Sequence, residues 1–121
     1  MVIVPDFLIK RIYQKGSLKR VENGVCITLK NVLGPGFISG FNYVKINDTV
    51  YEAKDVKFIM NGKEYTNADV SEENPIAFRL GQTGTLIMLG EDSLKDGVNS
   101  IEIEALNPEA GKVVLKVEDN I

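Results

Sequence analysis

Histidine is absent from this 121-residue chain, and Cys26 is its only cysteine. These absences exclude Ser-His and Cys-His nucleophile pairs, histidine-based zinc sites and an internal disulfide. Acid–base catalysis near neutral pH would need a strongly shifted carboxylate, lysine or tyrosine instead. Enzymes without histidine exist, so catalysis by this chain alone is less expected but not excluded. We predict no catalytic residue, no cofactor and no metal.

Long apolar runs are also missing. No window approaches about 18 consecutive apolar residues, which excludes a membrane-spanning helix. The opening segment Met1–Asp6 has neither a basic start nor a long apolar stretch, so a secretory signal is not expected. A lone cysteine without a secretory route is typical of a reducing compartment. The sequence therefore predicts a cytoplasmic protein without a membrane partner.

Charge is distributed unevenly between the two halves of the chain. Residues 1–63 contain ten Lys or Arg against five Asp or Glu, and residues 64–121 contain four against twelve. No acidic residue lies between Phe7 and Val21, a segment with five basic side chains. Such a segment occurs on RNA-binding surfaces, but lysines also protect exposed strand edges from aggregation. With a net charge of −3 and no interleaved aromatic residues, a protein partner is favoured over nucleic acid.

Helical periodicity is scarce, whereas short apolar or alternating runs recur between Gly, Pro, Asn and Asp. Runs of this kind predict strands. Parallel α/β folds need crossover connections of about a dozen residues or more, for which the spacing leaves little room. We predict an all-β fold, a single-domain antiparallel β-sandwich of about ten short strands in two packed sheets over residues 1–121. The expected strands are 7–13, 17–21, 25–31, 37–46, 49–52, 56–60, 63–65, 76–80, 83–89, 99–106 and 111–117.

Turn residues and alternation add local detail. Asn23-Gly24 and Asn61-Gly62 each separate two strand-like runs, which favours type I′ hairpin turns with both residues at positive φ. The polar segment 66–74 is the only plausible helical turn, capped by Thr66 or Ser71. Period-2 spacing of apolar residues predicts which side chains face inward. The expected core consists of Ile27, Leu29, Val44, Ile46, Phe58, Ile87, Ile101, Ile103, Leu115 and Val117.

Three groups of residues are candidates for chemistry, and each favours a structural role. The run 34–36, Gly-Pro-Gly, matches neither phosphate-binding motif, because it lacks the Lys-Ser/Thr ending and a following helix. The acidic positions 72–73 and 91–96 do not have the alternating oxygen spacing of a calcium loop. The four tyrosines lie in strand-like runs, where the ring is usually buried and the hydroxyl stays at the rim.

A sequence of motifs in the middle of the chain resembles a known family. Val44–Asp48 is followed by an Asn-Gly hairpin with an aromatic-Thr pair at 61–66, a Leu-x-x-Gly turn at 94–97 and the strand 100–103. This order resembles the small β subunits of C-glycoside deglycosidases over roughly residues 40–106. The resemblance implies a β-sandwich that supports a larger, metal-dependent catalytic barrel, which opens a carbon–carbon glycosidic bond in an oxidised sugar conjugate. That family often has His where this chain has Val98-Asn99.

The N-terminal part resembles a second group. Val4–Lys10 together with Gly16–Lys19 is similar to small prokaryotic proteins of unclear role, some of which are labelled hydroxymethylglutaryl-CoA reductase. Reductase chemistry is not expected here, because the chain has neither the length nor the catalytic histidine of those enzymes.

The run 83–89 points to assembly. It is uncharged and apolar on both faces, as expected of a strand that is covered on both sides, whereas a lone sandwich covers only one face of each sheet. Loops or a local helix could supply the second cover. The alternative is an interface formed by Leu86 and Met88 or by Thr85 and Ile87. The leading hypotheses are a non-catalytic accessory subunit of a larger sugar-active enzyme and a self-associating β-sandwich binding module, ahead of a small enzyme.

Overall fold

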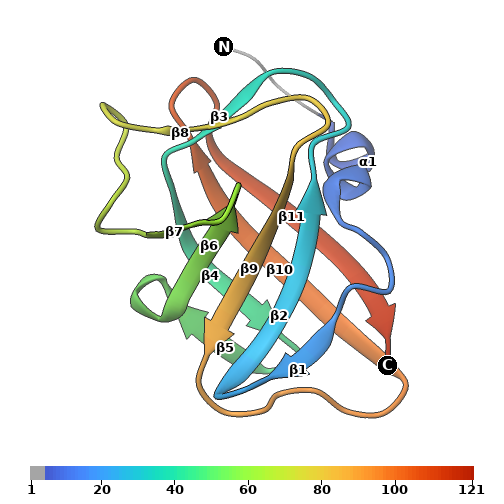
Figure 1. Ribbon diagram of the computed structural model, residues 1–121. Coiled ribbons are helices and arrows are strands. Elements are labelled where there is room, and N and C mark those ends of the chain that lie inside the picture. Colours follow the sequence, from blue (N-terminus) through green and yellow to red (C-terminus); the bar gives the residue numbers. More distant parts are fainter. Residues whose placement is uncertain (1–4) are drawn as a thin grey trace.

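The computed structural model describes residues 5–121 and shows an all-β fold (Figure 1). Val4 and the first residues of the expected 1–121 domain lie outside the described residues. The five-stranded sheet has the order β1-β2-β9-β6-β7, the four-stranded sheet β11-β10-β4-β5, and a small sheet pairs β3 with β8. The strands of the described part are β1 (Lys19–Val21), β2 (Gly24–Lys30), β3 (Gly36–Ile38), β4 (Gly40–Ile46), β5 (Thr49–Glu52), β6 (Val56–Met60), β7 (Lys63–Thr66), β8 (Ile76–Phe78), β9 (Thr83–Leu89), β10 (Val98–Asn107) and β11 (Gly111–Asn120).

All strand pairs are antiparallel, as predicted. The two larger sheets pack face to face, with β2, β9 and β6 in front of β4, β10 and β11 in Figure 1. The expected run 37–46 is divided at Ser39 into β3 and β4, which is why a third, small sheet appears beside the two that the sequence predicted. Ser39 donates its backbone N–H to the carbonyl of Leu106, and this bond holds the division against β10.

The expected strand 7–13 is wrong. This segment forms α1 (Asp6–Ile9) followed by the 3₁₀ turn η1 (Lys10–Ile12), which places Ile9 and Tyr13 in the core. The carbonyl of Pro5 accepts the N–H groups of Leu8 and Ile9 and so starts the helix. Ile9 reaches the core from the helix, whereas Tyr13 follows η1 in an extended conformation and forms a β-bridge with Leu29.

The expected helical turn at 66–74 is also wrong. The carboxylate of Asp69 accepts the backbone N–H of Thr66, and Ser71 and Asn74 close a second turn through their backbone groups. Side-chain bonds of this kind compete with helix formation. A second 3₁₀ turn, η2 (Ala53–Asp55), connects β5 to β6. None of the helices in the part of the chain that the structure describes is long and apolar enough to cross a membrane.

The two Asn-Gly turns differ. Asn61 and Gly62 have φ of 54° and 76° between the paired residues Met60 and Lys63, which confirms the type I′ hairpin. At the first hairpin the prediction is wrong by one residue, because Gly24 already belongs to β2 and only Asn23 has positive φ. A Cβ on Gly24 would lie 2.0 Å from the carbonyl oxygen of Met88, so this glycine permits close contact between strands.

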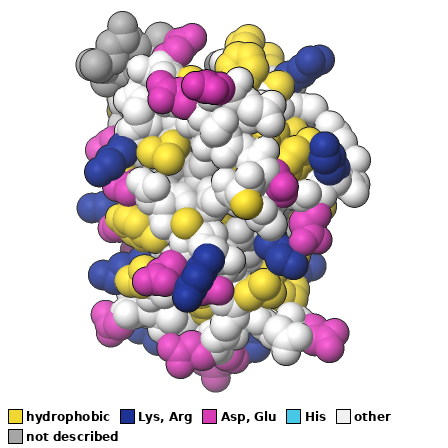
Figure 2. All heavy atoms as spheres, turned by 90° about the vertical axis from the view of Figure 1, so that its left-hand side faces the viewer, with side chains coloured by type: hydrophobic (Ala, Val, Ile, Leu, Met, Phe, Trp, Pro, Cys, Tyr) yellow, Lys and Arg dark blue, Asp and Glu magenta, His cyan; other side chains and the backbone are white. Residues whose placement is uncertain are grey.

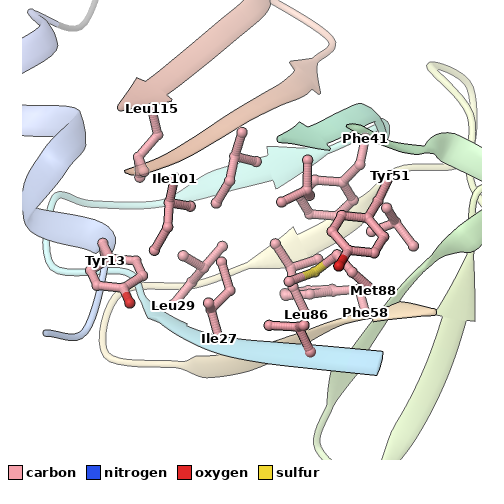
Figure 3. Close-up of a cluster of buried hydrophobic side chains, with 14 of the residues drawn as sticks. Tyr13, Ile27, Leu29, Phe41, Tyr51, Phe58, Leu86, Met88, Ile101 and Leu115 are labelled. Atoms are coloured by element: carbon pink, nitrogen blue, oxygen red, sulfur yellow. The ribbon is translucent and has the colours of Figure 1, made fainter. Parts of the chain in front are cut away.

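The core lies between the two larger sheets, whose side chains point toward one another in Figure 3. The expected core positions are buried in the structure, with two exceptions. Val117 is half-buried against the core, and Ile87 points outward because β9 directs Leu86 and Met88 inward instead. Because the side-chain period of a strand is two, an error of one residue exchanges its faces. The confirmed positions are Ile27, Leu29, Val44, Ile46, Phe58, Ile101, Ile103 and Leu115.

Candidate interaction site

The tyrosine hydroxyls take part in structural hydrogen bonds. Tyr13 donates to a carboxylate oxygen of Asp119 at 2.6 Å, and Tyr43 donates to Glu102. The hydroxyl of Tyr51 lies 2.6 Å from the carbonyl oxygen of Glu91. Burial and the bond to Asp119 raise the pKa of Tyr13, and the bond to Glu102 raises the pKa of Tyr43 to about 12. Both hydroxyls therefore stay protonated near neutral pH. A tyrosine that acts as a general base must first be deprotonated, so neither side chain is suited to that role.

Asp119 is the most deeply buried carboxylate of the described residues, with 3% of its surface exposed. Burial by itself would raise its pKa, but hydrogen bonds from Tyr13 and from the N–H groups of Gly16 and Asn120 outweigh burial and lower it. The same oxygen, Oδ2, accepts from Tyr13 and from Gly16, at 2.6 and 2.8 Å. This carboxylate holds the N-terminal segment against β11.

The remaining reactive groups are also poorly placed for chemistry. Cys26 is 3% exposed, and burial raises the pKa of its thiol, so little of the reactive thiolate forms. The carboxylate of Asp92 forms an ion pair with the guanidinium of Arg20 at 2.5 Å. The Gly-Pro-Gly run at 34–36 links β2 to β3, and the side chain of Asn31 braces it. Within residues 5–121, no three His, Cys, Asp or Glu side chains are close enough together to hold a metal ion.

The basic segment does not form one strand. Lys10 begins η1 and Lys15 follows it, and both line an open groove with Lys45, next to β10 and β11. None of these three lysines forms an ion pair with another described residue. Arg20 is tied to Asp92, as described above.

The four expected interface residues occupy opposite faces of β9. Leu86 and Met88 are fully buried, whereas Thr85 and Ile87 lie on the outer face of the five-stranded sheet. Of the two alternatives for an interface, the structure leaves only the pair Thr85 and Ile87 accessible. Ile87 lies between Cys26 and Lys57 on the neighbouring strands.

An apolar strip runs along this outer face. Ile59, Ile87 and Leu89 are each partly buried on the central strands β6 and β9, and Thr28 and Thr85 lie beside them. Lys57 and Glu64 form an ion pair at one side of the strip, with 2.9 Å between their charged atoms. The helical segments α1 and η1 do not form a layer over this face, since they contact β11 of the other sheet.

A groove opens where the five-stranded sheet ends. Its volume is about 710 Å³, and it lies between β7 and the segment that leads into β8. Both strands are on the left-hand side of Figure 1, which faces the viewer in Figure 2. Backbone and uncharged polar atoms fill most of the centre of that surface, and charged side chains lie mainly towards its margins (Figure 2). The residues lining the groove include Lys63, Glu64, Tyr65, Asp69, Val70, Ile76, Ala77 and Arg79.

Sequence reasoning missed this groove. Its walls are separated along the chain by the turns at 66–74, and it exists because β8 pairs with β3 instead of extending the larger sheet beyond β7. The break at Ser39 creates β3, and the sequence predicts one continuous strand over 37–46 in its place.

The chain matches a family model described as hydroxymethylglutaryl-CoA reductase, N-terminal domain, over residues 8–121. The chain belongs to this family. The match includes both larger sheets, the apolar strip and the groove, and begins within α1. It agrees with the resemblance of the N-terminal segment, whereas the resemblance to C-glycoside deglycosidase subunits finds no support in it. No curated protein matches the chain.

Proposed function

We propose that the chain is a non-catalytic accessory protein that docks on a larger catalytic chain. The observation on which this rests is the apolar strip of Ile59, Ile87 and Leu89, which are partly exposed on the outer face of the five-stranded sheet. Isolated apolar residues are ordinary on protein surfaces, but contiguous apolar surface rimmed by polar groups is typical of interaction sites. Lys57 and Glu64 form such a rim.

The buried polar side chains form hydrogen bonds within the fold, and this supports a non-catalytic role. No buried side-chain nitrogen or oxygen among the described residues lacks a hydrogen-bond partner, and the tyrosines and Asp119 act within the fold. The family description names an N-terminal domain, and such a domain works beside other parts of an enzyme. Reductase activity of this chain alone is not part of the proposal, because the chain has no histidine.

The partner that we propose is a larger sugar-active enzyme of the C-glycoside deglycosidase type, in the cytoplasm. The motifs between residues 40 and 106 support this choice, and the buried free Cys26 is compatible with a reducing compartment.

The test is purification of the tagged full chain from its native source, followed by identification of a stoichiometric companion and measurement of its mass in solution. The variant Ile87→Glu should lose the companion while keeping the melting curve of a folded protein. Val50→Glu is the matched control, because Val50 is 53% exposed on β5 of the other sheet. A stable monomer without companion would refute the proposal, and a homo-oligomer would favour the self-associating module.

A further inference from the structure

The edge strand β7 directs one unused set of backbone groups into the groove. Met60 and Lys63 close the two-residue hairpin, so their N–H and C=O groups pair with each other. Backbone groups alternate in direction along an antiparallel strand, and those of Glu64 therefore point away from β6. β7 is the last strand of its sheet in the described chain, so no further strand receives them.

The next outward group on β7 is already occupied. The N–H of Thr66 donates to Asp69 at 2.9 Å, and the hydroxyl of Thr66 bonds the same carboxylate. Asp69 therefore blocks the outward N–H of Thr66. The outward backbone groups of Glu64 remain free to pair with another strand. Exposed edges of this kind are templates for an additional strand.

The opposite wall offers a second set of backbone groups. The carbonyl of Phe37 accepts the side-chain amide of Asn107 at 2.9 Å, on the side away from β8. Phe37 is paired with Ala77. Because the Phe37 carbonyl points away from β8, these two residues form a pair without mutual hydrogen bonds. The N–H and C=O of Ala77 therefore point away from β3. Ala77 lines the groove. Glu64 and Ala77 thus present backbone donors and acceptors from its two sides.

Side chains define what would fit between these walls. Tyr65, Val70 and Ile76 form an apolar floor, and the first two are only partly buried against the core. Glu64 is paired with Lys57 at 2.9 Å. Arg79 forms no ion pair with a described residue.

The charges of the groove therefore favour an anion. Its two acidic groups, on Glu64 and Asp69, are both engaged, as shown above. Lys63 lies 5.0 Å from the centre of the Tyr65 ring and, like Arg79, has no carboxylate partner among the described residues. Asp69 keeps its negative charge, because its donors on Thr66 are uncharged, and these hydrogen bonds, with help from Lys63, lower its pKa. An acidic side chain entering the groove would therefore be attracted chiefly by Arg79.

We propose that the β7–β8 groove binds an extended segment of the partner protein, which pairs with β7 as a further strand. The segment has alternating apolar residues that contact Tyr65 and Val70, and an acidic side chain near Arg79. Backbone hydrogen bonds supply affinity in this mode of recognition, and alternate side chains supply specificity. The inference rests on the proposed function only in taking the partner to be a protein.

The probe is a capped seven-residue peptide that alternates valine with threonine and has one central aspartate. It is titrated into the ¹⁵N-labelled full chain and followed by NMR. Amide shifts should cluster on β7 and β8 around Glu64 and Ala77. A peptide methylated on every backbone nitrogen should lose binding. Replacing its aspartate by lysine should weaken binding several-fold in the natural chain and have little effect in Arg79→Ala.

Glu64→Pro removes the outward N–H, a position where an edge strand tolerates proline. It should weaken peptide binding by roughly tenfold or more, equivalent to about 1.4 kcal/mol. Val50→Pro is the matched control, since Val50 occupies the equivalent outward position on β5. Glu64→Ala keeps the N–H and should retain binding.

Equal binding of the methylated peptide, shifts centred on Ile87, or no shifts at millimolar peptide would overturn the inference. Loss of a dimer in Glu64→Pro would instead assign the groove to a second copy and would equally overturn it. A companion that co-purifies with Glu64→Pro but not with Ile87→Glu would refute only the strand-pairing inference and leave the proposed function intact.

Discussion

Tyr13 and Asp119 are 106 positions apart in the chain, yet the tyrosine hydroxyl lies 2.6 Å from the carboxylate. This bond, with the N–H of Gly16 on the same oxygen, joins the segment after η1 to the end of β11.

Tyr13→Phe should lower the free energy of unfolding by about 1–3 kcal/mol, because it removes a donor from a buried carboxylate. Tyr43→Phe is the matched control: its partner Glu102 is only half-buried, and the cost should be about 0.5–1 kcal/mol. Urea denaturation of both variants measures the difference. Equal costs would show that burial of the Asp119 carboxylate is unimportant.

Asp119 should also make stability depend on pH. Its pKa in the folded protein is lowered, so the unfolded chain takes up the proton first as the pH falls. The stabilisation is complete above the unfolded pKa of about 3.9 and is lost as the pH falls through the folded value. The melting temperatures of the natural protein and Asp119→Asn should therefore differ most near neutrality and converge in acid. A constant difference down to about pH 2.5 would contradict this linkage.

Gly24→Ala should destabilise by about 3 kcal/mol, the upper range for overpacking, because its Cβ would lie 2.0 Å from the Met88 carbonyl oxygen. Gly36→Ala is the control: the nearest atom to a Cβ there, the Phe78 oxygen, is 3.7 Å away. Thermal melting compares the two. A mild effect at Gly24 would mean that β2 and β9 can separate slightly without loss of pairing.

Gly62→Val should cost more stability than Gly62→Ala. The φ of Gly62 is +76°, and a Cβ would have open space around it, so the backbone conformation alone determines the cost. A β-branched residue is least tolerant of that region. Alanine should cost about 1 kcal/mol and valine more. Negligible effects of both substitutions in chemical denaturation would refute the turn assignment.

Leu86→Glu and Ile87→Glu should have different consequences. Leu86 is fully buried, so a carboxylate there should prevent folding, whereas Ile87 lies partly exposed on the outer face and should accept one. Circular dichroism and sedimentation separate loss of fold from loss of assembly. Folding of Leu86→Glu, or failure of Ile87→Glu to fold, would mean that the faces of β9 are reversed.

Local signals in the sequence were sufficient for much of the fold. Alternation and turn residues predicted antiparallel strands, and the expected strands 56–60 and 83–89 match β6 and β9 residue for residue. Asn61-Gly62 predicted its turn because the backbone conformation depends on those two residues themselves. The strand periodicity of β2 likewise identified Ile27 and Leu29 as core.

Only the tertiary structure decided the features that depend on residues distant in the chain. A strand that is apolar on both sides, such as β9, has no local signal for which face meets the core, and the opposite sheet selected Leu86 and Met88. The segment 7–13 forms α1 and η1, and the core contacts of Ile9 and the bridge from Tyr13 to Leu29 depend on strands that come later in the chain. The groove between β7 and β8 exists because β8 pairs with β3, a pairing that joins residues about forty positions apart and leaves no trace in either segment alone.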